Sequence, residues 1–412
     1  MSIVSTTSKT LQAGLRHRPT AKGKGGPATA RAHAWSTDGS GAGTGPLGNN
    51  AIFPALGLQA VDQDTGEILR IERKPDGSMG LAAPSAMERR ALMYARKSIV
   101  DDHLQLLPAR KDGQPHRTFK CYRVPLPASQ VAAMYSHQYS KAFYAGLQVC
   151  ANPWLCPVCM RKLSERKKVE VETGVEIAKA MGRRAVLMTL TFKHSGQDKL
   201  DDLLKCLLDA YERGFSKNKS ARLFKEAMGT MGNIKALEIT WGEKNGFHPH
   251  LHVLMLIDKD APSPEQIQIQ ASAIWRKACM AVGRIADPVY GCNVQEGDSA
   301  GGYLSKMGLD DKRWTLASEM TKGSSKNGKA TGLSMMQLVD LMGEGHKAAT
   351  AAWVQMAIAT QGRHPLRWSN GLRKALGMAG PRTDEELAAE TEDESAEIFS
   401  RITSKGWKLI YS

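Results

Sequence analysis

An α+β fold is predicted by three observations on the sequence. Short apolar segments rich in β-branched residues alternate with helical segments between residues 183 and 310. Four cysteines lie in the stretch 85–182 that precedes them. A helical region, 311–380, follows them. The chain is therefore expected to contain a cysteine module, an antiparallel sheet with helices, and a helical C-terminal region.

The composition excludes several classes of protein. The 412 residues include 56 Lys and Arg against 41 Asp and Glu, and 42% are hydrophobic, which is enough for a packed core. Seven cysteines are too few for a disulfide scaffold, and the longest apolar runs are far shorter than the ~18–20 residues of a membrane span. No apolar stretch resembling a secretory signal opens the chain. We expect a soluble, cytoplasmic protein with no membrane partner.

The charge is unevenly distributed. The segment 383–399 holds eight acidic groups and no basic one, so the rest of the chain has a surplus of 23 positive charges within a net charge of +15. Such a surplus favours nucleic acid as the partner. The acidic segment is interpreted as a solvated helix face or linker, with a DNA-mimicking role as the alternative.

Residues 1–84 are predicted to be a disordered, basic N-terminal region. Positions 1–50 contain nine Gly, twelve Ser or Thr and six Lys or Arg with one Asp, and they show no apolar periodicity. A transit peptide would also be poor in acids and rich in serine, but the glycine content argues against it.

Two helices are expected around the cysteines. The first covers 85–106 and begins at the pair Pro84–Ser85, and the second covers 157–181. The second helix carries a basic cluster that is expected to contact DNA: Arg161, Lys162, Arg166, Lys167 and Lys168.

The most regular pattern lies in 183–310. Strands are expected over 185–193, 233–241, 247–257 and 287–296, and helices over 200–228, 264–282 and 300–307. This β-α-β-β-α-β order is that of the ferredoxin-like, split βαβ fold, with one appended helix. The strands that flank the polar turn 242–246 are expected to pair as an antiparallel hairpin.

Further helices are expected over 335–360 and 370–377. The acidic tail, 381–412, is expected to end in a short strand over 407–411.

Three histidines stand at alternate positions of one predicted strand: His248, His250 and His252. Strand side chains alternate between faces, so His250 and His252 project about 7 Å apart on one face and can converge on a metal ion. The third ligand is either His248 or Glu238 of the preceding strand, and Glu243 in the turn is less well placed. Mixed nitrogen and oxygen ligands suit Mg²⁺ or Mn²⁺, although imidazoles also suit Zn²⁺.

Tyr303 and Lys306 open the last predicted helix of this region. Positions i and i+3 share a helix face, so the ammonium group can lie beside the tyrosine hydroxyl or reach the same phosphate. A tyrosine is a poor nucleophile unassisted, and a neighbouring cation eases attack.

Four cysteines are spaced as metal ligands: Cys121, Cys150, Cys156 and Cys159. Four thiolates can form a closed, structural zinc site, and His137 is an alternative to Cys121, which is placed on a strand. A redox pair is the rival interpretation, but no thioredoxin-like context surrounds the C-x-x-C motif. The other cysteines, Cys206, Cys279 and Cys292, are expected to be buried thiols.

The histidine, threonine and tyrosine motifs together resemble those of a known family. The run from His248 to Leu254, His-Pro-His-Leu-His-Val-Leu, is similar to the metal motif of the HUH endonucleases, specifically of the replication initiators (Rep proteins) of rolling-circle plasmids. Leu187–Thr191 resembles their first motif, and Tyr303–Lys306 their third. The segments 150–166 and 368–373 resemble flanking parts of these proteins, so the resemblance covers about 117–377.

The resemblance implies a ferredoxin-like HUH nuclease core and a defined reaction. A Mg²⁺ or Mn²⁺ ion polarises a phosphate of the plasmid double-strand origin, single-stranded at the nick, and Tyr303 attacks it to form a 5′-phosphotyrosyl link. Lys306 positions the phosphate or lowers the tyrosine pKa, while Thr189 and Thr191 shape the site or contact DNA. A host polymerase and helicase are the implied partners.

One position departs from the family pattern. Some relatives place a glutamate four residues before the tyrosine as the base for termination, and here that position is Ser299. The nearest acids are Glu296 and Asp298, of which Glu296 is the candidate.

Two other functions remain open from the sequence. One is a related HUH enzyme, a single-tyrosine transposase or a mobilisation relaxase, which shares the nicking chemistry. The other is a non-enzymatic, zinc-containing regulator that binds nucleic acid, which leaves the histidines and Tyr303 unexplained.

Overall fold

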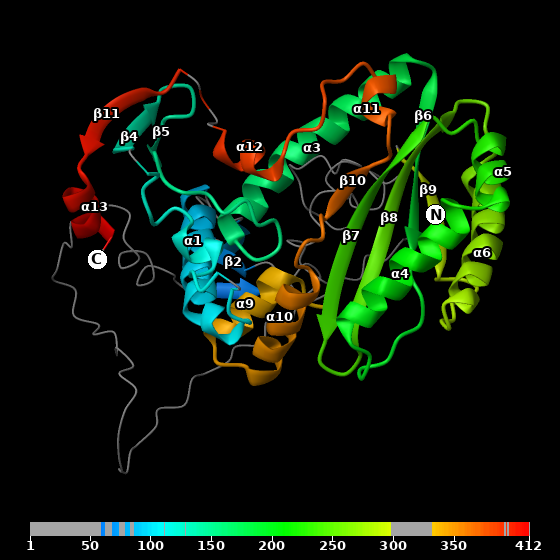
Figure 1. The fold of residues 1–412 in the computed structure, drawn as a ribbon, viewed down its shortest axis with the longest axis horizontal. Coiled ribbons are helices and arrows are strands. Elements are labelled where there is room, and N and C mark those ends of the chain that lie inside the picture. The colour runs from blue at the N-terminus through cyan, green and yellow to red at the C-terminus, as the bar shows by residue number, and fades with distance from the viewer. Residues whose placement is uncertain are drawn as a thin grey trace, which may run out of the picture. The chain divides into compact units, whose positions relative to one another are not determined.

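A computed structural model describes residues 59–61, 68–73, 79–82, 86–110, 112–127, 129–297, 332–390, 393 and 395–411. The chain divides into two units, 1–42 and 43–412, and all described residues lie in the second. Helices accompany three antiparallel sheets in this described part of the chain (Figure 1). The predicted α+β class with antiparallel pairing is therefore confirmed.

The largest sheet has the strand order β10-β7-β8-β6-β9, and all neighbouring strands are antiparallel. Its strands are β6 (Arg183–Leu190), β7 (Gly232–Gly242), β8 (Gly246–Asp258), β9 (Cys292–Glu296) and β10 (Leu366–Trp368). The helices that connect them are α4 (Leu200–Phe215), α5 (Lys219–Ala227) and α6 (Pro264–Ala281). The element order from β6 to β9 is the one expected from the sequence, apart from a break between α4 and α5.

The break between α4 and α5 follows from local chemistry. Asn218 adopts extended backbone angles and its side chain accepts a hydrogen bond from the amide of Ala221, so a new helix begins there. The helix expected over 300–307 lies outside the described residues.

The β7–β8 hairpin supplies the centre of the sheet. Its register runs without a shift from Gly232, opposite Leu256, to Gly242, opposite Gly246. Gly246 has φ +73°, and a Cβ there would lie 2.8 Å from the Cα of Gly196, so this tight turn requires glycine. The predicted hairpin is thus present.

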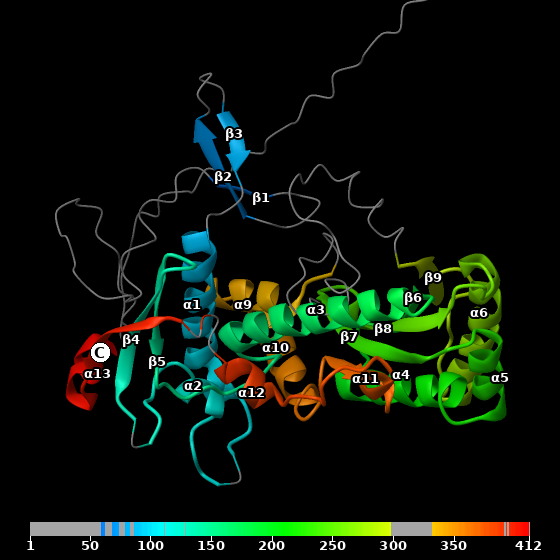
Figure 2. The same cartoon turned by 90° about the horizontal axis from the view of Figure 1, so that it is seen from above.

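The sheet is covered on both faces (Figure 2). Alternate residues of β6 and β8 pack with α4 and α6 on one face, where Leu203, Leu207 and Trp275 are fully buried. The intervening residues pack with α3 (Pro157–Ala180) on the other, through Val171 and Ala178. Each fully buried aliphatic side chain contributes about 1.5–3 kcal/mol, so the two-faced burial fixes the register of the strands.

The cysteine module begins with α1 (Ala86–His103), which ends in a 3₁₀ turn, Leu104–Leu106. The short helix α2 (Arg117–Lys120) follows. The helix α3 begins directly after Cys156 and contains Cys159. The helices predicted over 85–106 and 157–181 agree with α1 and α3. The strand predicted around Cys121 is wrong, because this residue lies in a turn directly after α2.

A small sheet brings together a strand near the C-terminus and two strands that begin at residue 131. Its order is β11-β4-β5, with β4 (Val131–Ser136), β5 (Lys141–Ala145) and β11 (Glu397–Ile402). Beyond it, the strand predicted over 407–411 is wrong, since α13 (Ser404–Tyr411) is a helix. Helical spacing brings Trp407 and Ile410 together against Val131 and Leu147, which a strand would not do.

The remaining C-terminal elements are short helices. They are α9 (Met335–Gly343), α10 (Lys347–Ala359), α11 (Leu372–Ala375) and α12 (Asp384–Ala389). The single helix expected over 335–360 is broken near Gly345, which has φ +82°. The acidic segment is a helix and a strand rather than a linker.

The stretch 1–84, predicted to be disordered, contains strands where the structure describes it. They are β1 (Gln59–Val61), β2 (Ile68–Arg73) and β3 (Met79–Ala82), paired in the order β1-β2-β3. The prediction is wrong for these residues. None of the helices in the described part of the chain is both long and apolar enough to cross a membrane.

Candidate functional site

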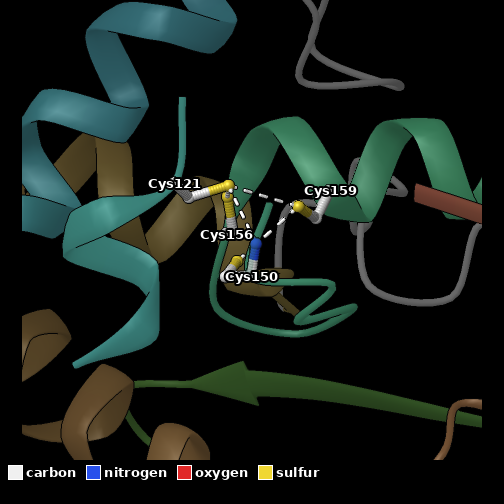
Figure 3. Close-up of side chains that lie close together, drawn as sticks. All are labelled: Cys121, Cys150, Cys156 and Cys159. Atoms are coloured by element: carbon white, nitrogen blue, oxygen red, sulfur yellow. Dashed lines mark hydrogen bonds between the residues drawn. The ribbon is translucent and has the colours of Figure 1, made fainter. Parts of the chain in front are cut away.

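Four buried thiols form a compact cluster in the described part of the chain. The Sγ atoms of Cys121, Cys150, Cys156 and Cys159 all lie within 4.8 Å of one another. Figure 3 shows the four side chains gathered together. The Sγ–Sγ distance is 3.5 Å between Cys121 and Cys159, 3.6 Å between Cys150 and Cys159, and 3.8 Å between Cys156 and Cys121. Sulfurs on a tetrahedron with metal bonds of about 2.3 Å lie roughly 3.8 Å apart. The cluster therefore fits a structural metal ion such as zinc.

The loop between Cys150 and α3 folds so that its cysteines converge. The side-chain oxygen of Asn152 accepts hydrogen bonds from the amides of Trp154 and Leu155, both 2.9 Å away, and so folds the loop back. Cys156 then caps α3, and Pro157 occupies its first turn. Cys156 and Cys159 consequently face the same point from positions three residues apart at the start of α3.

The four thiols shift one another's pKa in opposite directions. Burial raises the pKa of Cys156, and hydrogen bonds from Cys121 and Cys150 raise the pKa of Cys159. Hydrogen bonds from the neighbouring thiols, first of all Cys121, lower the pKa of Cys150, so that one thiolate is stabilised among the four sulfurs. A redox pair needs only two thiols, whereas four converge on one point here, which favours the metal-site interpretation. His137 is exposed and lies 3.6 Å from Glu397, so it does not replace Cys121.

The histidines of β8 form a row on one face of the sheet. The ring centroids of His248 and His250 lie 4.1 Å apart, and those of His250 and His252 lie 6.2 Å apart. Leu251 and Val253 point to the opposite face, into the core beneath α4 and α6. The alternation predicted from the sequence is thus present.

Glu238 lies on β7 directly opposite His250. Its Oε2 atom lies 2.7 Å from Nε2 of His252, and both side chains are buried. A carboxylate only accepts, so Nε2 of His252 holds the proton in this contact. The proton must leave before that nitrogen binds a metal ion.

Two threonines of β6 and its C-terminal extension hold the histidines. The Thr189 hydroxyl lies 3.1 Å from Nδ1 of His252, and the Thr191 hydroxyl lies 2.9 Å from Nε2 of His248. Hydrogen bonds of this kind fix the tautomer and the ring orientation of a histidine. Both threonines, predicted to shape the site or contact DNA, therefore act on the imidazoles in this structure.

His194 is a neighbour that the sequence patterns did not single out. Its ring centroid lies 4.6 Å from that of His248. Burial lowers the pKa of His194, and burial together with the His194 charge lowers the pKa of His248 to about 4, against a smaller opposing effect of Glu238. Both rings are thus neutral at pH 7. His194 follows the T-L-T strand by three residues, which was the only signal available in the sequence.

Other expected site residues are placed apart from the histidines or are not described. Glu296, the candidate acid, pairs with Arg184 and lies opposite Val186, on the face that packs under α6. It is about three residues, roughly 10 Å, along β6 from Thr189 and on the other face, so it lies apart from the histidines. Its role as the acid beside Tyr303 stays a prediction. Tyr303 and Lys306 lie outside the described residues.

The basic cluster of α3 is engaged within the protein. Arg161 pairs with Glu165, and Lys168 with Glu172, on the helix itself. Three more contact the acidic C-terminal segment: Lys162 donates to the Ala388 carbonyl, Arg166 pairs with Glu390, and Lys167 pairs with Asp384 at 2.6 Å. Their predicted contact with DNA stays a prediction.

Comparison with known proteins gives the central segment a family. Residues 141–280 match the family model described as "Replication protein". This range runs from β5 to α6 and includes three of the four cysteines of the cluster and the histidine row. No solved structure matches the chain.

Curated relatives point the same way. The chain is 24% identical to "Protein rep" of Streptomyces lividans over 64% of this chain and 73% of that protein. It is 32% identical to the "Neomycin resistance protein" of Streptomyces cyanogenus over 27% of this chain and 31% of that protein. It is 31% identical to "Protein rep" of Lactiplantibacillus plantarum over 30% of this chain and 38% of that protein, so it spans only about a third of these last two.

The matched region, 141–280, is similar to the replication protein family. The matches confirm the resemblance that the motifs indicated: the chain is related to the plasmid replication initiators, the Rep proteins.

Proposed function

We propose that this protein nicks and rejoins plasmid DNA at a double-strand origin, in a metal-dependent reaction that starts rolling-circle replication. The observation that carries the proposal is the row of histidines on β8 beside Glu238 of β7, inside the segment that matches replication proteins. The resemblance of this row to the HUH motif then supplies the reaction class.

The topology supports a ferredoxin-like HUH core. Numbered along the chain as first to fourth, the strands β6 to β9 lie in the order second, third, first, fourth, with every neighbour antiparallel. Two split βαβ units interleave in this way, and they place the β8 histidines in the interior of the sheet rather than on an edge strand. Such a central position excludes water from one side of the site.

The donor set of the histidine site has the chemistry of a divalent-cation site. Imidazole nitrogens from His250 and His252 and a carboxylate oxygen from Glu238, or a nitrogen of His248, would hold Mg²⁺ or Mn²⁺. Within the described residues these atoms do not gather as closely as the cysteine sulfurs do, although Glu238 contacts His252 directly. A bound ion would polarise the scissile phosphate as a Lewis acid.

The chain's own residues then perform the transfer. The hydroxyl of Tyr303 loses its proton, and its oxygen attacks the phosphorus atom. The bond from phosphorus to the 3′-oxygen of the preceding nucleotide breaks, and that oxygen takes up a proton to become a free 3′-hydroxyl. Lys306 is the cation that positions the phosphate and favours the phenolate. The reverse attack by a 3′-hydroxyl rejoins the strand, so no nucleotide cofactor is required.

A zinc ion in the cysteine cluster would act structurally. It would tie α2, the loop before α3 and the start of α3 to one point, since each contributes a ligand. The helix α3 covers the face of the sheet that carries the histidines.

The free 3′-hydroxyl would be extended by a host polymerase, with a host helicase opening the duplex.

The decisive experiment is a denaturing-gel assay on labelled single-stranded DNA from the plasmid that carries this gene. The purified protein is incubated with Mn²⁺ or Mg²⁺, beside the variants Tyr303→Phe and His250→Ala/His252→Ala. Tyr290→Phe, at a side chain that is 78% exposed, and His137→Ala are the matched controls. We expect a covalent protein–DNA band that requires metal, persists in both controls and disappears in both test variants.

Other results would redirect the assignment. A band that survives Tyr303→Phe places the nucleophile elsewhere. Tight binding with no covalent band on any fragment favours the zinc-containing regulator that binds nucleic acid. Nicking confined to transposon ends or a transfer origin identifies a transposase or a mobilisation relaxase.

A further inference from the structure

A groove at the β10 edge of the large sheet carries cations that the nicking reaction does not use. It has a volume of about 1960 Å³, and ten of its lining residues are Lys or Arg while four are Asp or Glu. Small-molecule sites typically occupy about 300–1,000 Å³. Its size and its excess of six positive charges therefore favour a polyanionic chain over a small ligand.

Three cations of this groove gather at one point. Arg367 of β10 stands directly opposite Lys235 of β7 in the register, and paired residues of neighbouring strands point to the same face. Like charges in directly opposed positions destabilise a sheet. Lys225, at the end of α5, is the third member of this group, which we call the edge cations, and it acts electrostatically on Lys235.

No acid of the described residues forms an ion pair with an edge cation, whereas most other groove cations have one. Arg363 pairs with Asp201 and Arg373 with Glu170, for example. The one acid that acts on Lys235 is Glu212, and its carboxylate is paired with Lys217. The repulsion among the edge cations is therefore not offset from within this part of the protein.

Burial adds to this repulsion. Lys225 and Lys235 are half-buried, and the ammonium group of Lys235 lies 4.6 Å from the ring centroid of Tyr211. Burial, and after it the charges of Arg367 and Lys225, lower the pKa of Lys235. An anion between these side chains would remove the repulsion and restore the ordinary pKa.

We propose that the edge cations bind the phosphate backbone of DNA at a second site, distinct from the histidine site. Lys235 precedes Glu238 by three residues on β7 and points to the opposite face of the sheet, so the two sites are roughly 10 Å apart along the strand and separated by the sheet. One DNA molecule can thus be held at the sheet edge while another stretch of it reaches the histidines. The partner, DNA, rests on the proposed function, but the binding itself requires no nicking.

The test is the salt dependence of DNA binding. Affinities of wild type, Lys235→Ala/Arg367→Ala and Lys225→Ala are measured by fluorescence anisotropy with mixed-sequence oligonucleotides, single-stranded and duplex, of equal length. The control is Arg276→Ala/Lys277→Ala, which removes two exposed cations from α6 outside the groove. Each phosphate contact contributes about 0.9 to the logarithmic salt slope for duplex and about 0.7 for single strands.

We expect the Lys235→Ala/Arg367→Ala variant to lose about 1.4 from the slope on single strands or about 1.8 on duplex, with at least a tenfold loss of affinity at low salt. The arm that shows the loss identifies the form of DNA held. The melting temperature should stay the same or rise, because a repulsion is removed, and Lys235→Arg/Arg367→Lys should bind as wild type.

Unchanged slopes in both arms, or an equal loss in the α6 control, would overturn the second site. If the edge-cation variants lose binding but the wild type forms no covalent band in any assay, the nicking proposal fails and the second site stands. The two proposals can therefore fail separately.

Discussion

His252 and Glu238 meet at 2.7 Å across the β7–β8 ladder, in the interior of the large sheet. The contact is buried and Thr189 holds the other nitrogen of the imidazole at 3.1 Å. The histidine therefore has a fixed orientation before any metal ion arrives. Under the proposed function, Glu238 would act either as a metal ligand or as the group that orients one, and either role would make it necessary for metal binding.

Glu238→Gln tests this role. The amide keeps a hydrogen-bonding group of the same size beside His252 but removes the negative charge that a divalent cation requires. We expect affinity for Mn²⁺, measured by calorimetry, to fall about 10–100-fold, as for other groups that support metal ligands. The covalent band on the denaturing gel should weaken in parallel, and high Mn²⁺ should restore part of it.

Glu243→Gln is the control for this change. Glu243 lies in the β7–β8 turn and is exposed, so its loss should leave both readings unaltered. Full activity of Glu238→Gln at low Mn²⁺ would leave His248 as the third ligand.

Metal removal tests the cysteine cluster. We expect about one zinc ion per chain by elemental analysis, as the Cys₄ donor set implies. Cys156→Ser should lose it and lower the melting temperature, because metal binding free energy contributes directly to folding. A chelator such as EDTA should lower the wild-type melting temperature to that of the variant.

The matched control is Cys279→Ser, at a buried thiol outside the cluster whose pKa burial raises to about 12. It should keep the metal. A wild-type protein that contains no metal, or a Cys156→Ser variant that retains it, would contradict the structural zinc site.

The two proposed metal sites differ in how much of each could be predicted from the sequence. Period-two alternation of His248, His250 and His252 is a property of any strand. The polar turn 242–246 predicted the hairpin partner of that strand, so Glu238 could be placed on the neighbouring strand. Cys121 was included by ligand count alone, and its turn conformation could not be foreseen. Glu296 was chosen by distance along the chain to Tyr303, which says nothing about the face of β9 from which it projects.

The sequence did not predict the elements whose conformation depends on contacts with distant parts of the chain. The strand β10 has only three residues and forms by pairing with β7, so it is too short for a periodic pattern to predict it. The helix α13 was mistaken for a strand because Trp, Ile and Tyr favour strands, but packing decides its conformation. The indole of Trp407 is 4% exposed, lies 5.0 Å from the Tyr144 ring and donates to the Arg123 carbonyl at 2.8 Å.

Trp407→Ala measures that packing. Removal of a buried indole costs about 3–5 kcal/mol of unfolding free energy, part of which is the hydrogen bond to Arg123. We expect the small sheet β11-β4-β5 to lose protection against hydrogen exchange before the large sheet does. Leu409→Ala, at a side chain that is 76% exposed, should change stability by less than about 0.5 kcal/mol. Equal effects of the two substitutions would show that α13 does not pack through Trp407.

The acidic segment offers a last prediction, because its contacts occupy groups that were expected to bind DNA. Asp384 and Glu390 neutralise Lys167 and Arg166 of α3, and the Lys167–Asp384 pair is largely buried. In Asp384→Asn/Glu390→Gln these two cations lose their counter-charges. The loss of a buried ion-pair partner is costly, so the melting temperature should fall. At the same time non-specific DNA affinity should rise several-fold, with a steeper salt slope by up to about two phosphate contacts.

The variant Glu243→Gln/Asp260→Asn removes the same charge elsewhere and should change neither property. Binding that stays at the wild-type level, with stability lowered, would mean that Arg166 and Lys167 serve only to hold the C-terminal segment against α3.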